Sequence, residues 1–372
     1  MSPDRDQRLT FLDLRPGPEA AGIRRAIERV LDSGWFVLGP EVEAFEAEFA
    51  AASGAKHAVG VGNGTDAITL ALRAAGVKPG DEVIVPAMTA AFTGLAVLAA
   101  GATPVIADVE RDTLTLDPAA CEAAVTSRTA AIVPVHLYGQ AADMAAIGGI
   151  AARHGLTIVE DCCQAHLATA AGVPVGTAGA AGAFSFYPTK NLGALGDGGA
   201  VITNDASLAD RVRQLRNGGQ THRYVHTLPG VNSRLDELQA AVLRARMPLL
   251  AASTQARRAL AGEYRAHLPA AAAPIRERDP GHVYHLFPVR SARRDALQAG
   301  LAAAGVETLI HYPIPLSRQP AFAHLGVRDR CVVADDAAGT LLSLPLHPRL
   351  QSGDVRRVAA AIRTFEEGQT TA

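Results

Sequence analysis

Residues 183–200 read AFSFYPTKNLGALGDGGA and contain the most informative pattern of the chain. The apolar run Ala183–Phe186 leads into a polar turn that carries Lys190, and a second apolar run begins at Ala200. The glycines between them are too closely spaced for a helix or a strand. The pattern therefore predicts strand, loop and strand, with Lys190 displayed on the loop beside a sheet.

Lysine is rare in this chain, since only three of its 35 basic residues are lysine: Lys56, Lys78 and Lys190. Arginine can supply surface charge, but its guanidinium stays protonated and cannot form a Schiff base with a carbonyl. Lys56 and Lys78 lie in turn-like segments that we expect to be solvated. Desolvation beside a sheet would lower the pKa of Lys190 toward neutrality, which favours carbonyl chemistry there. The simpler alternative is a lysine that caps a loop carbonyl.

Short runs rich in Val, Ile and Ala alternate with helix-length amphipathic segments from His57 onward. This alternation is typical of a mostly parallel sheet covered by helices. We expect one large α/β domain whose seven strands lie at Ala58–Val61, Glu82–Val85, Thr103–Ala107, Ala130–Val135, Thr157–Glu160, Ala183–Phe186 and Ala200–Thr203.

The pattern changes after Asn232 to two long helical segments, Leu235–Arg246 and Pro248–His267, the second with proline at its first position. The alanine-rich patch Ala270–Ala273 looks compositional. We expect a large domain over residues 1–249 and a small α+β domain over residues 250–372. The runs that predict the small domain are Val283–Val289, Arg293–Ala304, Val306–Ile310, Leu341–Leu344 and Val355–Phe365.

Composition excludes several classes of protein. The formal net charge is −2, without a basic run, so neither a nucleic-acid surface nor a polybasic membrane patch is indicated. The start of the chain lacks the apolar region of a secretory signal, from which we expect a cytoplasmic address. Residues 83–107 carry no charge over a length that could span a bilayer, but Pro86, Gly94, Gly101 and Pro104 divide them. A buried strand–helix–strand unit is therefore expected.

Cysteine and histidine spacing gives no support to a metal centre. The 12 histidines show no H-E-x-x-H pattern, and the cysteines show no C-x-x-C spacing. We expect no metal, no disulfide framework, and reduced, mostly buried thiols at Cys121, Cys162, Cys163 and Cys331.

A glycine-rich turn, VGVGNGTDA at residues 59–67, places a strand, small residues and a helix start in succession. Such a turn presents backbone N–H groups and a hydroxyl to a phosphate at a helix N-terminus. Gly62, Gly64 and Ala67 also fit a loose dinucleotide fingerprint, which leaves an NAD-dependent oxidoreductase as an alternative. That fingerprint needs an acidic residue at the end of the next strand, and this strand ends at Pro86. A ligand-free turn with an Asn or Thr N-cap is a further alternative.

A buried strand, LTIVED at residues 156–161, ends in two acidic residues. Open α/β sheets bind ligands at the carboxyl ends of their strands, so Asp161 is positioned to meet one. Beside a pyridoxal ring, this carboxylate would keep the ring nitrogen protonated and make the ring an electron sink. Gln164 could then donate to the phenolic oxygen. A cap or a salt bridge is the alternative role for a single strand-terminal acid.

Together these motifs resemble the DegT/StrS-type (DegT/DnrJ) sugar aminotransferase family, which has the aspartate-aminotransferase fold (fold type I). The resemblance covers nearly the whole chain. The residues that carry it, in order, are Gly34–Glu41, Asn63–Ala67, Pro134–Gly139, Glu160–His166, Ser185–Gly199, Gly230–Leu235 and His311–Pro313.

The resemblance implies a homodimeric aminotransferase that depends on pyridoxal 5′-phosphate (PLP) and has shared active sites. It implies that Lys190 is the cofactor lysine and Asp161 the partner of the ring nitrogen, both catalytic, with Asn232 reaching the phosphate from the neighbouring subunit. The implied cofactor-binding residues are Gly64, Thr65, Asp161, Gln164, Ser185, Lys190 and Asn232.

The resemblance also implies the reaction, in which glutamate or glutamine gives its amino group to a keto-sugar, expected to be a nucleotide-linked keto-deoxysugar of amino-sugar biosynthesis. Some relatives are dehydratases with histidine in place of the lysine, so Lys190 favours transamination. The position after Thr89, usually an aromatic residue stacked on the ring, is Ala90. Either Phe92 or a smaller side chain would cover the ring. A non-catalytic regulator with the same fold is the remaining alternative.

Overall fold

A computed structural model describes residues 8–325 and 331–370 of the chain. Its largest sheet has seven strands in the order β1-β9-β8-β5-β4-β2-β3. Strand β9 pairs antiparallel with β1 and β8, and the other neighbours are parallel. The strands are β1 (His57–Val61), β2 (Glu82–Pro86), β3 (Thr103–Ala107), β4 (Thr129–Ile132), β5 (Thr157–Asp161), β8 (Ala181–Ser185) and β9 (Gly199–Thr203).

The predicted α/β class and all seven strands are confirmed, with one shortened strand. The prediction extended β4 to Val135, but the strand ends at Ile132. Pro134 has no N–H to donate to a neighbouring strand, so the regular ladder stops before it. The chain still runs beside β5, because the Asp161 N–H donates to the Pro134 carbonyl over 2.9 Å.

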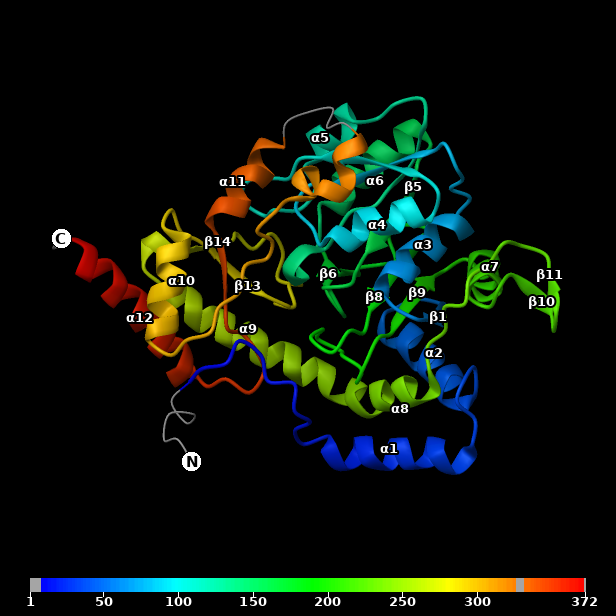
Figure 1. Cartoon of the computed structure of the whole chain (residues 1–372), viewed down its shortest axis with the longest axis horizontal. Coiled ribbons are helices and arrows are strands. Elements are labelled where there is room, and N and C mark those ends of the chain that lie inside the picture. Colours follow the sequence, from blue (N-terminus) through cyan, green and yellow to red (C-terminus); the bar gives the residue numbers. More distant parts are fainter. Residues whose placement is uncertain (1–7, 326–330, 371–372) are drawn as a thin grey trace.

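Helices cover both faces of this sheet (Figure 1). Alternate strand residues point to opposite faces, so Val59 and Val201 pack with α3 and α7 while Phe184 and Ile202 pack with α2 and α8. The helices of this part are α1 (Ala20–Ser33), α2 (Pro40–Ala52), α3 (Gly64–Ala74), α4 (Ala91–Ala99), α5 (Pro118–Ala123), α6 (Met144–His154), α7 (Ala206–Arg216) and α8 (Glu237–Arg246).

The uncharged segment 83–107 forms β2, α4 and β3, as predicted. Across the described residues, no helix combines the length and the apolar character that a bilayer crossing needs. Two short hairpins complete this part. Figure 1 shows the hairpin of residues 220–226 projecting beside α7. They are formed by β6 (Thr169–Ala170) with β7 (Val173–Pro174), and by β10 (Gln220–His222) with β11 (Val225–His226).

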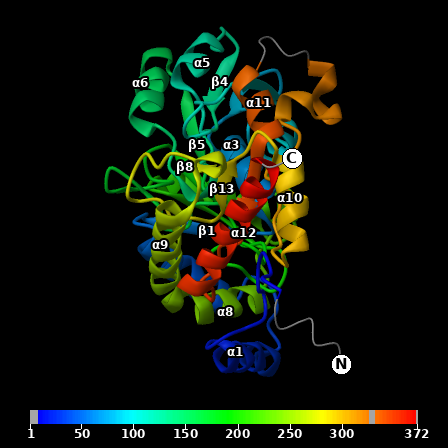
Figure 2. The ribbon, with the colours of Figure 1, turned by 90° about the vertical axis from the view of Figure 1, so that its left-hand side faces the viewer.

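The C-terminal part is built on a three-stranded antiparallel sheet in the order β12-β13-β14. Figure 2 shows α9, α12 and α10 side by side in front of β13, around an apolar core. The elements are α9 (Leu250–His267), β12 (Ala273–Pro274), β13 (Phe287–Arg290), α10 (Arg294–Ala303), α11 (Val332–Thr340), β14 (Leu341–Leu344) and α12 (Ser352–Thr370).

One predicted boundary in this part was wrong. Pro248 lies in a 3-10 turn, and α9 begins two residues later at Leu250. The run Val306–Ile310 forms two isolated bridges, one between Val306 and Leu9 and one between Leu309 and Ser343 of β14. The alanine patch is structural, since Ala273 pairs with Arg290 in the sheet. A domain boundary at residue 250 stays a prediction.

Candidate active site

Three segments converge at the carboxyl edge of the large sheet. Asp161 is the last residue of β5, Ser185 the last of β8, and Gly64 the first of α3. A Cβ on Gly64 would lie 2.7 Å from the Ser185 Cβ and 2.8 Å from the Cys163 Sγ. The close approach of the helix to the two strand ends therefore requires glycine at this position.

Asp161 is buried, and both of its carboxylate oxygens are held. The Thr93 hydroxyl donates to Oδ2 over 2.8 Å, and the Cys163 N–H donates to Oδ1 over 3.1 Å. Thr93 lies on α4 and is itself 2.9 Å from the Thr89 hydroxyl. The carboxylate is therefore fixed in one orientation before any ligand arrives. Nothing in the local sequence pattern singled out Thr93.

Lys190 is half-buried on the loop after β8, in a turn closed by its own N–H, which donates to the Tyr187 carbonyl over 2.8 Å. Burial lowers the pKa of Lys190, although the nearby Cys163 and Asp161 oppose this change. Because burial outweighs these neighbours, the neutral amine is easier to form than on a surface lysine. Lys56 and Lys78 are exposed, as predicted.

The start of α3 is arranged as an anion site. The Asn63 side chain caps the helix by accepting from the Asp66 N–H over 2.8 Å. Within the described part of the chain, the amides of Gly64 and Thr65 have no acceptor. Two free N–H groups at a helix N-terminus beside the Ser185 hydroxyl suit a phosphate. Together with the carboxylate of Asp161 and the amine of Lys190, this donor set fits PLP.

Gln164 is buried and makes two hydrogen bonds through its side-chain amide. Its Oε1 accepts from the Tyr138 N–H over 2.8 Å, and its Nε2 donates to the Tyr312 hydroxyl over 2.8 Å. The amide thus joins the segment after β4 to the segment 311–313. Tyr138 and Tyr312 lie within two of the segments that carry the family resemblance, Pro134–Gly139 and His311–Pro313, but the sequence assigned neither of them a role.

Asn232 is exposed and pairs through its backbone with Asn217. Its neighbour Ser233 accepts from the Gly62 N–H over 2.9 Å and donates to Asp66 Oδ2 over 2.6 Å. The segment that carries Asn232 is therefore tied to the turn before α3. Its expected contact with the phosphate of a second subunit stays a prediction.

Three histidines surround Lys190, and the charge of Lys190 acts on each of them. Burial lowers the pKa of His166 to about 3 and that of His311 to about 4, and it lowers the pKa of His285 well below the usual value. All three are therefore neutral near pH 7. His285 Nδ1 lies 3.3 Å from Asn191 Oδ1, next to the lysine, and no spacing in the sequence indicated it.

Ala90 and Phe92 are the two positions considered for covering the cofactor ring. Ala90 is half-buried at the start of α4, and the Phe92 side chain is 63% exposed. Phe92 is therefore a surface residue of this chain, and its role over the ring stays a prediction.

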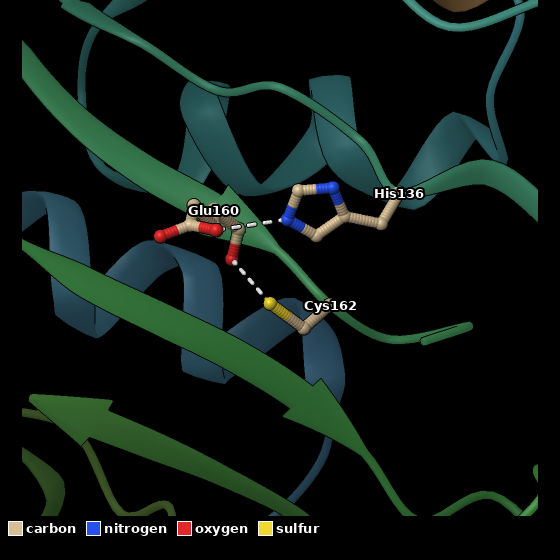
Figure 3. A group of neighbouring side chains, drawn as sticks. All are labelled: His136, Glu160 and Cys162. Atoms are coloured by element: carbon tan, nitrogen blue, oxygen red, sulfur yellow. Dashed lines mark hydrogen bonds and ion pairs between the residues drawn. The ribbon is translucent and has the colours of Figure 1, made fainter. Parts of the chain in front are cut away.

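A second polar cluster lies at the end of strand β5, which also carries Asp161, and is drawn in Figure 3. His136 Nε2 donates to Glu160 over 2.9 Å, and His136 Nδ1 accepts from the Ala142 N–H over 3.1 Å. Glu160 also accepts from three amides of the loop at 176–179, over 2.7–2.9 Å. The Cys162 Sγ lies 3.7 Å from the Glu160 carbonyl oxygen. His136 and Glu160 already use their acceptor atoms to hold neighbouring groups, and burial raises the pKa of the Cys162 thiol, so the cluster ties the loop to β5 and is poorly prepared to bind a metal.

Comparison with known proteins gives a consistent result. Residues 19–363 match the family model described as the DegT/DnrJ/EryC1/StrS aminotransferase family. The chain is 50% identical over 366 residues to a dTDP-3-amino-3,4,6-trideoxy-alpha-D-glucose transaminase of Streptomyces venezuelae, with 97% of each chain covered. It is 46% identical to a UDP-N-acetyl-3-dehydro-alpha-D-glucosamine 3-aminotransferase of Acidithiobacillus ferrooxidans, covering 97% of this chain and 98% of the relative.

A solved structure is similar over the same length. The crystal structure of S. venezuelae DesV in complex with a ketimine intermediate superposes with a TM-score of 0.93 at 49% identity. The match covers 97% of this chain and 99% of that chain.

Proposed function

Because this chain belongs to the DegT/DnrJ/EryC1/StrS aminotransferase family, we propose that it transfers an amino group from glutamate or glutamine to carbon 3 of a nucleotide-linked keto-sugar. The chain is a PLP-dependent aminotransferase. The observation that carries the proposal is the convergence of Lys190, Asp161 and the free amides of α3 at one sheet edge. The choice of carbon 3 is supported by two relatives whose names place the amino group there.

The residues at the sheet edge divide the cofactor between them. The Gly64 and Thr65 amides and the Ser185 hydroxyl would hold the phosphate, since a helix N-terminus favours an anion. Asp161 would bind the protonated ring nitrogen, and Gln164 would face the phenolic oxygen. When bound, PLP supplies an electron sink for the carbanion that forms at the substrate carbon.

Lys190 carries the proton in both halves of the reaction. In the first, its neutral Nζ would remove the proton from the α-carbon of the amino donor; the amino group would stay on the cofactor, and water would supply the oxygen of the oxo-acid that leaves. In the second, the same nitrogen would deliver a proton to the carbon of the keto-sugar that receives the amine. Burial lowers the pKa of Lys190, which makes the neutral amine that acts as the base easier to form.

Asp161 acts by staying fixed in place. Hydrogen bonds from the Thr93 hydroxyl and the Cys163 N–H hold its two oxygens, so the carboxylate needs no reorganisation when the cofactor binds. A carboxylate held in this way keeps a proton on a ring nitrogen beside it.

We also propose that the enzyme is a homodimer in which Asn232 completes the site of the other subunit. Asn232 is exposed, and a hairpin that follows α7 lies near it in sequence. Large apolar side chains are exposed on several segments, as expected for a surface that pairs with a second copy. They include Trp35, Phe36, Val37, Phe92, Leu95, Tyr187, Leu195, Tyr224, Val225 and Val231.

The proposed reaction is tested by incubating the purified protein with glutamate or glutamine and 3-keto sugars linked to dTDP or UDP. We expect amino-sugar products by mass spectrometry and NMR, and no turnover for Lys190→Ala. Lys190→Arg is the matched control, since it keeps the charge but cannot bond covalently to a carbonyl. Normal transamination by either variant would overturn the role of Lys190. Bound nicotinamide cofactor would favour an oxidoreductase, and bound PLP without turnover on any acceptor would favour a regulator.

A further inference from the structure

The side-chain amide of Gln164 can have only one orientation. A backbone N–H can donate but cannot accept, so the Gln164 atom that lies 2.8 Å from the Tyr138 nitrogen must be the carbonyl oxygen. The NH2 end then points at the Tyr312 hydroxyl, 2.8 Å away. Since an amide nitrogen carries no acceptor lone pair, the Tyr312 oxygen is the acceptor of this bond.

The proton of the Tyr312 hydroxyl is consequently left over. Among the described residues no acceptor receives it, although the side chain is only partly exposed. Burial raises the pKa of Tyr312 above its usual value, so the hydroxyl keeps its proton at neutral pH. A hydroxyl that accepts but does not donate lacks one of its usual partners.

The surroundings of Tyr312 show where that partner belongs. The Tyr312 hydroxyl lies 2.8 Å from Gln164 Nε2, three residues beyond Asp161 in the chain, and the charge of Asp161 helps to raise the pKa of Tyr312. The preceding residue is held on both sides, because the Tyr138 hydroxyl donates to the His311 carbonyl and His311 Nδ1 lies 3.0 Å from the Ser343 hydroxyl. The Tyr312 hydroxyl is therefore preorganised beside the residues that would bind the cofactor ring.

We propose that the Tyr312 hydroxyl donates a hydrogen bond to the phenolic oxygen of bound PLP, and that Gln164 aims it there. This inference rests on the proposed function. The two side chains form a directional chain from the Tyr138 N–H through the Gln164 amide to the Tyr312 hydroxyl. Tyr312 stabilises the negative charge on the phenolic oxygen, and Gln164 keeps a second N–H for the same atom.

The hydrogen bond has a spectroscopic consequence. When the nitrogen that links Lys190 to the cofactor loses its proton, the phenolic oxygen loses a partner that shared its charge. A donor on that oxygen stabilises the deprotonated form, so it lowers the pKa of the linkage nitrogen. This pKa is read from the change of the cofactor's visible absorbance with pH.

The test is Tyr312→Phe in the holoenzyme. We expect the midpoint of the absorbance titration to rise by about one pH unit, the size expected for a hydrogen bond to a charged group. The other titratable groups around this point, Asp161, Cys163, His166, His285 and His311, are unchanged in the variant. Tyr264→Phe is the matched control, because it removes a buried hydroxyl that donates to Pro345 in the C-terminal part, and its midpoint should equal that of the wild type.

A second substitution keeps the proposal falsifiable if Tyr312→Phe does not fold. Incorporation of 3-fluorotyrosine in place of Tyr312 retains the hydroxyl and makes it a stronger donor, so the midpoint should fall. An unchanged midpoint in either Tyr312 variant would overturn the proposal. Borohydride reduction of the wild type, followed by mass spectrometry of the Lys190 peptide, tests separately whether the cofactor is bonded to Lys190 at all. A wild type without cofactor on this peptide contradicts the proposed function itself.

Discussion

The hydroxyl of Thr93 donates a hydrogen bond to Oδ2 of Asp161 over 2.8 Å, although the two residues lie 68 positions apart in the sequence. Thr93 reaches the carboxylate from α4, and Asp161 stands at the end of β5. The packing of this helix against the sheet thus determines how the proposed partner of the ring nitrogen is oriented.

Thr93→Val removes the hydroxyl while keeping the shape of the side chain. We expect kcat to fall roughly tenfold or more, because a hydrogen bond to a charged group contributes about 1.5–3 kcal/mol. Thr93→Ser keeps the hydroxyl and should restore most of the rate. Steady-state kinetics and the cofactor absorbance of both variants check this, and equal losses in the two would show that packing matters more than the hydrogen bond.

Lys190→Met in the cofactor-free protein should raise the free energy of unfolding near pH 7. The pKa of Lys190 is lowered by burial from its usual 10.5, so the unfolded chain binds this proton more tightly than the folded chain. The advantage of the variant is largest below the folded pKa and disappears as pH rises toward 10.5. Urea unfolding between pH 6 and pH 10 measures the difference, and a constant gap across this range would contradict the prediction.

Gly64→Ala should destabilise the protein and weaken PLP binding. The new methyl group would lie 2.7 Å from the Ser185 Cβ and 2.8 Å from the Cys163 Sγ, and overpacking of this kind costs about 1–3 kcal/mol. Gly262→Ala is the control, because a Cβ there meets nothing within 4 Å inside α9 and should be neutral or stabilising. Thermal unfolding and equilibrium dialysis with PLP measure both effects. If the Gly64→Ala variant were as stable as the control, α3 would be able to shift without cost.

Glu160→Gln should destabilise the protein near neutral pH and make its stability less dependent on acid. Burial alone would raise the pKa of Glu160, but hydrogen bonds from His136 and from the amides of Gly176 and Gly179 hold it below its usual 4.5. The carboxylate therefore stabilises the fold above pH 4.5, and this contribution is lost as pH falls through the folded pKa. Losing a charged, buried acceptor costs about 1.5–3 kcal/mol at pH 7. Acid unfolding of the wild type and the variant, followed by circular dichroism, measures this difference. Identical unfolding curves would contradict the prediction.

Local sequence patterns were enough to predict the α/β class, the seven strands of the main sheet, and the places of Lys190 and Asp161 beside that sheet. These features are local: strands follow from short apolar runs, turns from clustered glycines, and a rare lysine from counting. The predicted strand at Ala130–Val135 ended early, at Ile132, because Pro134 interrupts a run that looked regular.

Only the tertiary structure decided which side chains hold the site in place. Thr93 and Asp161 meet across 68 positions, and Gln164 and Tyr312 across 148, so neither hydrogen bond leaves a trace in any local window. The lowered pKa of Lys190 also depends on burial by segments far away in the chain. Periodicity is a property of neighbouring residues, whereas orientation and desolvation of polar groups arise from the packing of distant ones.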